Sequence, residues 1–192
     1  MIELVIRQYL PTDKAFSDRE SPIWKKCENI LPTREAWKYV TPLLATARKA
    51  NGFGLSANQV DLDIPLFVST IEGKLQPCYR PRVICYNPAK GYYSGKEMCL
   101  SFPGAAVPVT RPYQVQVDFI AFPNGKHRKI WLEGHEAVGF QHECDHLQGI
   151  TIFDRYKWQL QAKAAEMAKQ ITAREATAEP QVQSVIYDPT KD

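Results

Sequence analysis

The chain has 192 residues, 44% of them hydrophobic and 23% charged, which is enough for one domain with its own core. Its formal net charge of +3 is too small to indicate direct recognition of nucleic acid or of an anionic membrane. No apolar run approaches the roughly 20 residues that span a bilayer, and the amino-terminal segment contains Glu3 and no long apolar stretch, so we expect no signal peptide.

The amino-terminal part predicts a short strand over residues 2–9 and a helix over residues 33–50. Thr33 is expected to cap this helix and Gly52 to end it. Its apolar residues recur at helical spacing: Trp37, Val40, Leu44 and Ala47. Pro42 is expected to kink or divide the helix, because proline lacks the N–H that the preceding turn requires.

The middle of the chain predicts β structure. Runs of β-branched and aromatic residues cover residues 64–70, 82–87, 113–122 and 127–132. In the third run Val115, Val117 and Phe119 alternate with polar residues, which is typical of a half-buried antiparallel strand. The sequence Pro-Asn-Gly at residues 123–125 predicts a turn into the fourth run.

Two helices are predicted in the carboxyl-terminal part, over residues 134–147 and about 154–174, with Gly149 ending the first. The residues after 176 are poor in apolar side chains and contain two prolines. Since no repeat or linker interrupts the chain, we expect one domain over residues 1–176 and a loosely held tail over residues 177–192.

The five cysteines show no CxxC spacing, and their number is odd: Cys27, Cys78, Cys85, Cys99 and Cys144. This usage indicates a reducing compartment with free or metal-bound thiols rather than a set of disulfides.

The segment His142-Glu143-Cys144-Asp145-His146 carries the strongest chemical signal. Two histidines four residues apart project from one helical face and can hold one metal ion, while the adjacent glutamate can accept the proton of a metal-bound water. An isolated histidine pair on a surface helix is the simpler explanation, but Glu143 favours a hydrolytic metal site. Asp145 is expected to support a neighbouring backbone or side chain.

A catalytic site of this kind needs a third protein ligand and one open position. A third histidine is excluded, because the HExxHxxGxxH pattern would place it where Ile152 stands. Glu166 on the following helix and the thiolate of Cys99 are the two remaining candidates, and both stay open at this point.

Three separated motifs resemble, in the same order, the signature motifs of peptide deformylases: GFGLSANQV (52–60), EMCLSFPG (97–104) and QHECDHLQG (141–149). The resemblance covers roughly residues 30–155. It implies an α+β fold of antiparallel β-sheets packed around a central metal-binding helix, with an amino-terminal and a carboxyl-terminal helix. It also implies a metal-dependent hydrolase that removes the N-formyl group from the initiator methionine of new polypeptides and releases formate.

The resemblance implies that Cys99, His142 and His146 bind one divalent metal ion. Fe(II) is the metal with which the family typically works, and Zn(II) or Ni(II) are further candidates. Glu143 would accept the proton of the metal-bound water and deliver it to the departing amine. The Gln59 side-chain amide and the Leu100 backbone N–H would stabilise the negative oxygen that develops on the formyl group.

On the substrate side, Phe53 and Gly54 are expected to offer their backbone to an extended peptide. Val138, one turn before His142, is expected to line the methionine pocket, although plain core packing would explain Val138 equally well. Met98 stands where the family pattern has glycine, so its side chain is expected to crowd or reshape the substrate cleft.

A glutamate and an arginine that pair in the family correspond to Glu97 and Arg111. We expect a structural ion pair between them that holds the loop of Cys99.

Two alternatives remain beside a deformylase. One is a zinc peptidase of the HExxH type with Glu166 as third ligand. The other is a catalytically degenerate homologue that binds formylated peptide without turnover.

The expected partners are the N-formylmethionyl ends of nascent chains. The helix after Asp154 resembles an extension with which some family members contact the ribosome, and its charges are mixed, so a weak ribosome contact is predicted there. The expected location is the cytoplasm, or an organelle or host cytoplasm for an organellar or viral source.

Overall fold

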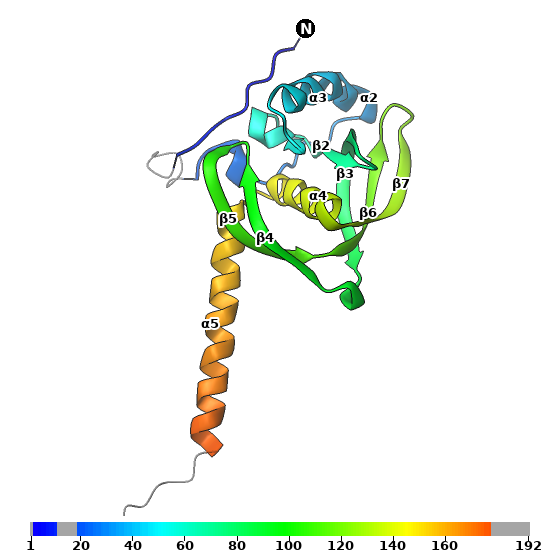
Figure 1. Cartoon of the computed structure of the whole chain (residues 1–192). Coiled ribbons are helices and arrows are strands. Elements are labelled where there is room, and N and C mark those ends of the chain that lie inside the picture. Colours follow the sequence, from blue (N-terminus) through cyan, green and yellow to red (C-terminus); the bar gives the residue numbers. More distant parts are fainter. Residues whose placement is uncertain (1, 11–18, 178–192) are drawn as a thin grey trace, which may run out of the picture. The chain divides into compact units, whose positions relative to one another are not determined.

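The computed structural model describes residues 2–10 and 19–177, with the side chains of 174–177 excluded (Figure 1). The chain divides into two compact units, Met1–Lys157 and Trp158–Asp192. The predicted boundary at residue 176 stays a prediction, and the predicted tail lies almost entirely outside the described residues.

The helical elements of the first unit are η1 (Pro22–Trp24), α2 (Thr33–Ala36), η2 (Trp37–Tyr39), α3 (Val40–Lys49), η3 (Ala57–Val60), η4 (Pro88–Lys90) and α4 (Gly134–Leu147). The helix predicted over residues 33–50 is divided, as Pro42 led us to expect. The interruption is η2, just before Pro42, because proline cannot donate to the carbonyl of Lys38 and its ring crowds that carbonyl. Pro32, not Thr33, occupies the cap position.

A five-stranded antiparallel sheet has the strand order β1-β2-β3-β6-β7, and β4 and β5 form a separate two-stranded sheet. The strands are β1 (Gly54–Ser56), β2 (Leu66–Ile71), β3 (Lys74–Tyr86), β4 (Tyr92–Cys99), β5 (Phe102–Pro112), β6 (Gln114–Ala121) and β7 (Lys126–Glu133). The expected α+β architecture with antiparallel sheets is therefore confirmed.

The strand predicted over residues 2–9 is wrong, because no regular strand is present there. That segment instead makes single backbone hydrogen bonds from Arg7 to the carbonyl of Gln59 and from Tyr9 to that of Ser101, each 2.8 Å long. These isolated bonds attach the segment to the rest of the first unit without forming a ladder.

Helix α4 is the central element of the first unit, between the five-stranded sheet and the β4–β5 pair (Figure 1). Its apolar face packs on the sheet: the Phe140 ring meets Phe67 edge-on at 5.0 Å and Phe119 at 6.0 Å. Ala137 and Leu147 complete this buried face. Residues on the other side of α4 are thereby turned toward β4.

The long helix α5 (Ile152–Thr177) begins in the first unit and forms the described part of the second unit. Its first turn is fixed by Asp154, whose Oδ2 accepts hydrogen bonds from the backbone N–H and the hydroxyl of Thr151 at 2.9 and 2.7 Å. No helix within residues 2–10 and 19–177 is both long and apolar enough to cross a membrane.

Asp154→Asn is expected to lower the free energy of unfolding by about 1–2 kcal/mol at neutral pH, because it weakens these bonds and an ion pair with Arg19. Burial alone would raise the pKa of Asp154, but hydrogen bonds from Thr151 and the charge of Arg19 lower it. A carboxyl group whose pKa is lower in the folded state stabilises that state at pH values above its pKa in the unfolded chain, near 3.9. This stabilisation is lost as the pH falls through the folded-state pKa. Urea unfolding of both proteins at pH 7 and pH 3 checks this; an equal difference at the two pH values would contradict it.

Candidate metal centre

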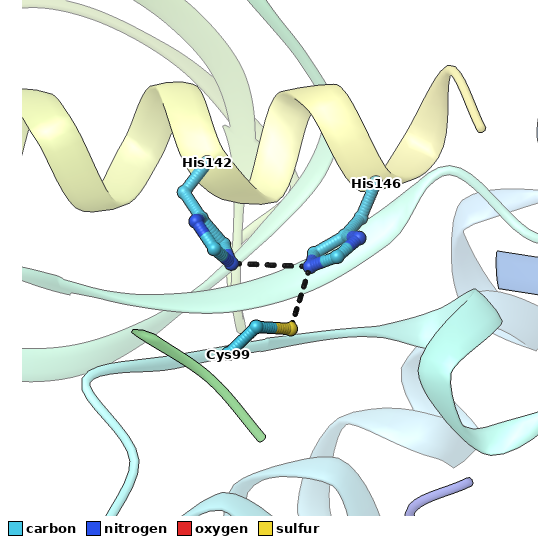
Figure 2. A group of neighbouring side chains, drawn as sticks. All are labelled: Cys99, His142 and His146. Carbon is cyan, nitrogen blue, oxygen red and sulfur yellow. Dashed lines mark hydrogen bonds between the residues drawn. The ribbon is translucent and has the colours of Figure 1, made fainter. Parts of the chain in front are cut away.

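Three potential metal ligands meet between α4 and the end of β4 (Figure 2). The Sγ atom of Cys99 lies 3.3 Å from Nε2 of His146, which in turn lies 3.1 Å from Nε2 of His142. All three donor atoms fall within 4.8 Å of one another. The sequence-predicted ligand set is thus brought together in one cluster.

The local folding of each element explains this convergence. His142 and His146 are one turn apart on α4 and therefore share a face. In β4 the side chains of Glu97 and Cys99 are buried and that of Met98 is exposed, as strand alternation requires. A register shift between Glu97 and Cys99 lets the strand bend where Cys99 meets the helix.

The donor set fits a divalent metal ion. His142 Nδ1 lies 2.8 Å from the Glu97 carboxylate, which places a proton on Nδ1 and leaves Nε2 as the ring atom that can bind a metal. Two imidazole lone pairs 3.1 Å apart repel each other unless a proton or a cation lies between them. A thiolate with two imidazoles is a ligand set that suits Zn(II) and Fe(II).

The pKa directions agree with this. Burial alone would lower the pKa of His142, but hydrogen bonds with Cys99 and Glu97 raise it to about 10, so a bound metal ion takes the place of a proton on this ring. Burial lowers the pKa of His146 well below its usual value, which keeps that ring in the neutral form that binds metals.

Glu143 lies on α4 directly beside the cluster and is buried. Its Oε2 has no hydrogen-bond partner within the described residues. Burial raises the pKa of Glu143 to about 7, against the opposing influence of His142. A Cβ added at Gly54 would lie 2.4 Å from Glu143 Oε1, so a glycine at 54 is what lets β1 approach this carboxylate.

Gln59 is almost fully buried, and its orientation is fixed from both ends of the amide. Its Oε1 accepts hydrogen bonds from the backbone N–H and the hydroxyl of Ser56 at 2.9 and 3.0 Å. Its Nε2 therefore points to the cluster, 3.5 Å from Cys99 Sγ and 3.1 Å from Ser101 Oγ. Leu100 follows Cys99 directly, and a Cβ added at Gly52 would lie 2.8 Å from Leu100 Cδ1, so a glycine at 52 leaves room for this side chain.

The comparisons with known proteins agree on one family. A family model described as "Polypeptide deformylase" matches residues 16–162. The chain belongs to the peptide deformylase family. A peptide deformylase of Aquifex aeolicus is 35% identical over 147 residues, covering 73% of this chain and 85% of that protein. Peptide deformylase 1B, chloroplastic, of rice is 39% identical over 110 residues, which are 56% of this chain and 40% of that longer protein.

Solved deformylase structures share the fold. That of Thermotoga maritima has 27% identity and a TM-score of 0.68, with 81% of this chain and 98% of that chain covered. A probable peptide deformylase from Synechococcus phage S-SSM7 has 26% identity and a TM-score of 0.67, with coverage of 80% and 100%. The peptidase and degenerate-homologue alternatives are not favoured by this family membership, and Glu166 lies in the second unit.

The residues predicted to bind the substrate differ in the exposure of their side chains. Phe53 and Met98 are 79% and 77% exposed, so both apolar side chains are available to a ligand. Val138 is buried on α4, one turn before His142. The Phe53 carbonyl already accepts hydrogen bonds from the backbone and hydroxyl of Thr70, both 2.9 Å long.

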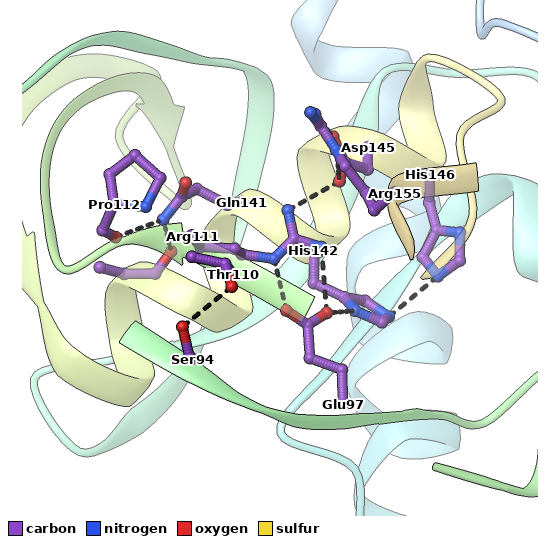
Figure 3. A network of polar contacts seen from close by, with 11 residues as sticks. Ser94, Glu97, Thr110, Arg111, Pro112, Gln141, His142, Asp145, His146 and Arg155 are labelled. Atoms are coloured by element: carbon purple, nitrogen blue, oxygen red, sulfur yellow. Dashed lines mark hydrogen bonds and ion pairs between the residues drawn. The ribbon is translucent and has the colours of Figure 1, made fainter. Parts of the chain in front are cut away.

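The predicted ion pair between Glu97 and Arg111 is present, with Nε–Oε1 and Nη2–Oε2 distances of 2.6 and 3.0 Å (Figure 3). Burial would raise the pKa of Glu97, but hydrogen bonds from His142 and Arg111 lower it to about 2. The carboxylate that orients His142 is therefore ionised. Arg111 also donates to Asp145 at 2.7 Å, so Asp145 supports a side chain, as predicted.

Sequence reasoning missed two residues that bind the backbone or the supporting side chains of the site rather than the metal-binding atoms. The Asn58 amide donates to the backbone carbonyl of His146 and so ties the first motif to the end of α4. Arg155 binds the far side of Asp145. Asn58 stands within a motif and was a detectable candidate, whereas nothing in the local sequence marks Arg155.

Proposed function

We infer that this protein removes the formyl group from the N-formylmethionyl ends of newly made polypeptides and releases formate. The observation that carries this is the Cys99, His142 and His146 cluster with Glu143 beside it, in a chain of the deformylase family. The test is formate release from an N-formylmethionyl peptide, with the N-acetylmethionyl peptide as control. Release from the formylated peptide alone is expected, and release from neither would contradict the proposal.

The three clustered side chains hold the metal, and Fe(II) is proposed as the native ion, with Zn(II) and Ni(II) as alternatives. When bound, such an ion lowers the pKa of water and polarises the formyl carbonyl. Glu143 takes the proton of the attacking water and passes it to the amine of methionine as the C–N bond breaks. Its buried carboxylate with a raised pKa supports this role.

Gln59 and Leu100 stabilise the oxygen that becomes negative during attack, through the Gln59 amide and the Leu100 backbone N–H. The Gln59 amide is fixed by Ser56 before substrate arrives, and such preorganisation is what makes a donor effective in the transition state.

Gln59→Leu is expected to lower kcat by about 10²–10³-fold with little change in metal content, the loss typical of one removed oxyanion donor. Steady-state kinetics and metal analysis on the same preparation check this. A tenfold or larger rise in KM at unchanged kcat would instead place Gln59 in ground-state binding.

Phe53, Gly54, Met98 and Val138 form the proposed substrate-binding side. Gly54 offers backbone next to Glu143, while the exposed side chains of Phe53 and Met98 offer apolar surface to the peptide. Val138 lines the pocket for the methionine side chain.

Met98→Gly is expected to change kcat/KM by about 10–200-fold in a manner that depends on the residue after methionine, since one apolar contact discriminates by roughly 1–3 kcal/mol. The metal content is expected to stay unchanged. Kinetics on a peptide series varied at that position are the measurement; one uniform factor across the series would contradict a specificity role for Met98.

The proposed partners are nascent chains, and the proposed location is where they are made, in the cytoplasm or an organelle. A weak ribosome contact through α5 remains a proposal. Deletion of residues 158–192 followed by co-sedimentation with ribosomes tests it, and unchanged sedimentation of the shortened protein would contradict it.

A further inference from the structure

A chain of charged side chains runs from the metal cluster to the start of α5, beyond the predicted ion pair (Figure 3). We propose that Arg155 is a positioning residue for His142, acting through the three charged residues that lie between them. The proposal rests on the proposed metal site and adds to it a residue of α5 that touches neither metal nor substrate.

The contacts are continuous. His142 Nδ1 donates to Glu97 at 2.8 Å, and both oxygens of Glu97 accept from Arg111. The Nη1 atom of Arg111 donates to Asp145 Oδ2 at 2.7 Å. Arg155 donates to the same Oδ2 from Nε at 2.7 Å and to Oδ1 from Nη2. Every link is an ionic hydrogen bond; the Arg111–Glu97 and Arg155–Asp145 pairs are bidentate, and Arg111 joins Asp145 by a single bond.

Charge balance makes Arg155 necessary to this arrangement. Glu97, Asp145 and Arg111 are buried, with side-chain exposures of 8%, 8% and 4%. Two buried carboxylates thus share one buried guanidinium, and Arg155, 38% exposed, supplies the second positive charge from the solvent side. Without Arg155, Asp145 would keep an uncompensated charge and compete with Glu97 for Arg111.

Competition between Asp145 and Glu97 for Arg111 would change the position of the metal ligand His142. Glu97 holds the His142 ring in the orientation that aims Nε2 at the cluster, and Arg111 holds Glu97 by two bonds. If Arg111 shifts toward Asp145, Glu97 loses part of its anchorage and the His142 ring becomes less well ordered. Outer partners of metal-ligating histidines affect metal affinity in this manner.

A purely structural role is the competing explanation, because the Arg155–Asp145 pair also joins the end of α4 to the start of α5. Such a role predicts lower stability without any change in the electronic environment of a bound metal. The two explanations are separated by a spectroscopic readout.

The experiment compares Arg155→Met with the unmodified full-length chain. Both are stripped of metal and titrated with Co(II) against a chelator, and the ligand-field and thiolate charge-transfer bands are recorded. We expect Arg155→Met to bind Co(II) about tenfold more weakly, at the low end for outer-shell substitutions, and to shift the bands. Arg155→Lys keeps the charge but loses the bidentate geometry and is expected to fall between the two.

Arg128→Met is the matched control, because Arg128, 29% exposed, donates to Gln76 and Glu72 and is not among the residues that line the cavity beside Arg111, Asp145 and Arg155. It is expected to leave affinity and spectrum unchanged. In a Glu97→Gln background, Arg155→Met is expected to have less than half its effect, since the route to His142 is already broken.

Unchanged Co(II) affinity and spectrum in Arg155→Met would overturn the proposal while leaving the metal site intact. An undiminished effect in the Glu97→Gln background would also overturn it, because the influence would then bypass Glu97. If Arg155→Met does not fold, Arg155→Lys is judged by the same criteria. Failure of the unmodified chain to bind Co(II) would overturn the proposed metal site and this proposal together.

Discussion

Replacement of Glu143 by glutamine is expected to lower kcat for formate release by about 10²–10⁴-fold, the contribution typical of a general base. The amide keeps the shape of the side chain and cannot accept the proton. Because Glu143 ligates nothing in the proposed site, metal content is expected to stay at that of the unmodified protein. Kinetics and metal analysis of the same sample check both parts.

The same variant is expected to be at least as stable as the unmodified protein. Glu143 is buried with one oxygen that has no partner within the described residues, so its charge costs free energy of folding. An amide carries no such charge penalty. Full activity of Glu143→Gln would contradict its role as proton carrier, and loss of metal would indicate that it acts as a ligand.

Replacement of Cys99 by serine is expected to weaken metal binding by more than about 100-fold, the upper limit for outer-shell substitutions, and to abolish formate release at limiting metal. A serine hydroxyl is a poor ligand at neutral pH, whereas a thiolate is strong and donates charge to the metal. Equilibrium dialysis against Zn(II) and the formate assay measure the two effects.

Cys85→Ser is the control for that substitution, because Cys85 is exposed on β3 and lies outside the cluster. It is expected to change neither metal binding nor activity. Metal binding that survives Cys99→Ser unchanged would contradict the thiolate as third ligand. Glu166 would then be the remaining candidate for the third metal ligand.

The parts of the fold with regular periodicity were predictable from sequence. Helix α4 was predicted with its observed bounds, and β6 and β7 to within one residue at each end. Strands β1, β4 and β5 were missed, and β5 was missed because Pro103, Pro108 and Pro112 argue against a strand by local rules. A two-stranded sheet leaves each strand with an open edge, where prolines break no ladder bond, and that fact is invisible before the topology is known.

Some features of the candidate site were likewise predictable from the sequence, and others depend on the fold. The i,i+4 histidines follow from helix geometry, but the distance between Cys99 and His146, 47 residues apart in sequence, follows only from the fold. Asp145 could be assigned a supporting role without its partner. Arg155 could not be assigned at all, because its contact depends on how α5 begins after the turn at Gly149.

The central claim is that one metal ion held by this cluster makes the chain a deformylase. Its most direct test is anaerobic formate release from an N-formylmethionyl peptide, with metal content determined on the same samples at increasing Fe(II) loading. The predicted result is a rate that rises in proportion to bound metal and levels off at one ion per chain. Formate release that is absent at full loading, or equally fast in the stripped protein, would contradict the claim.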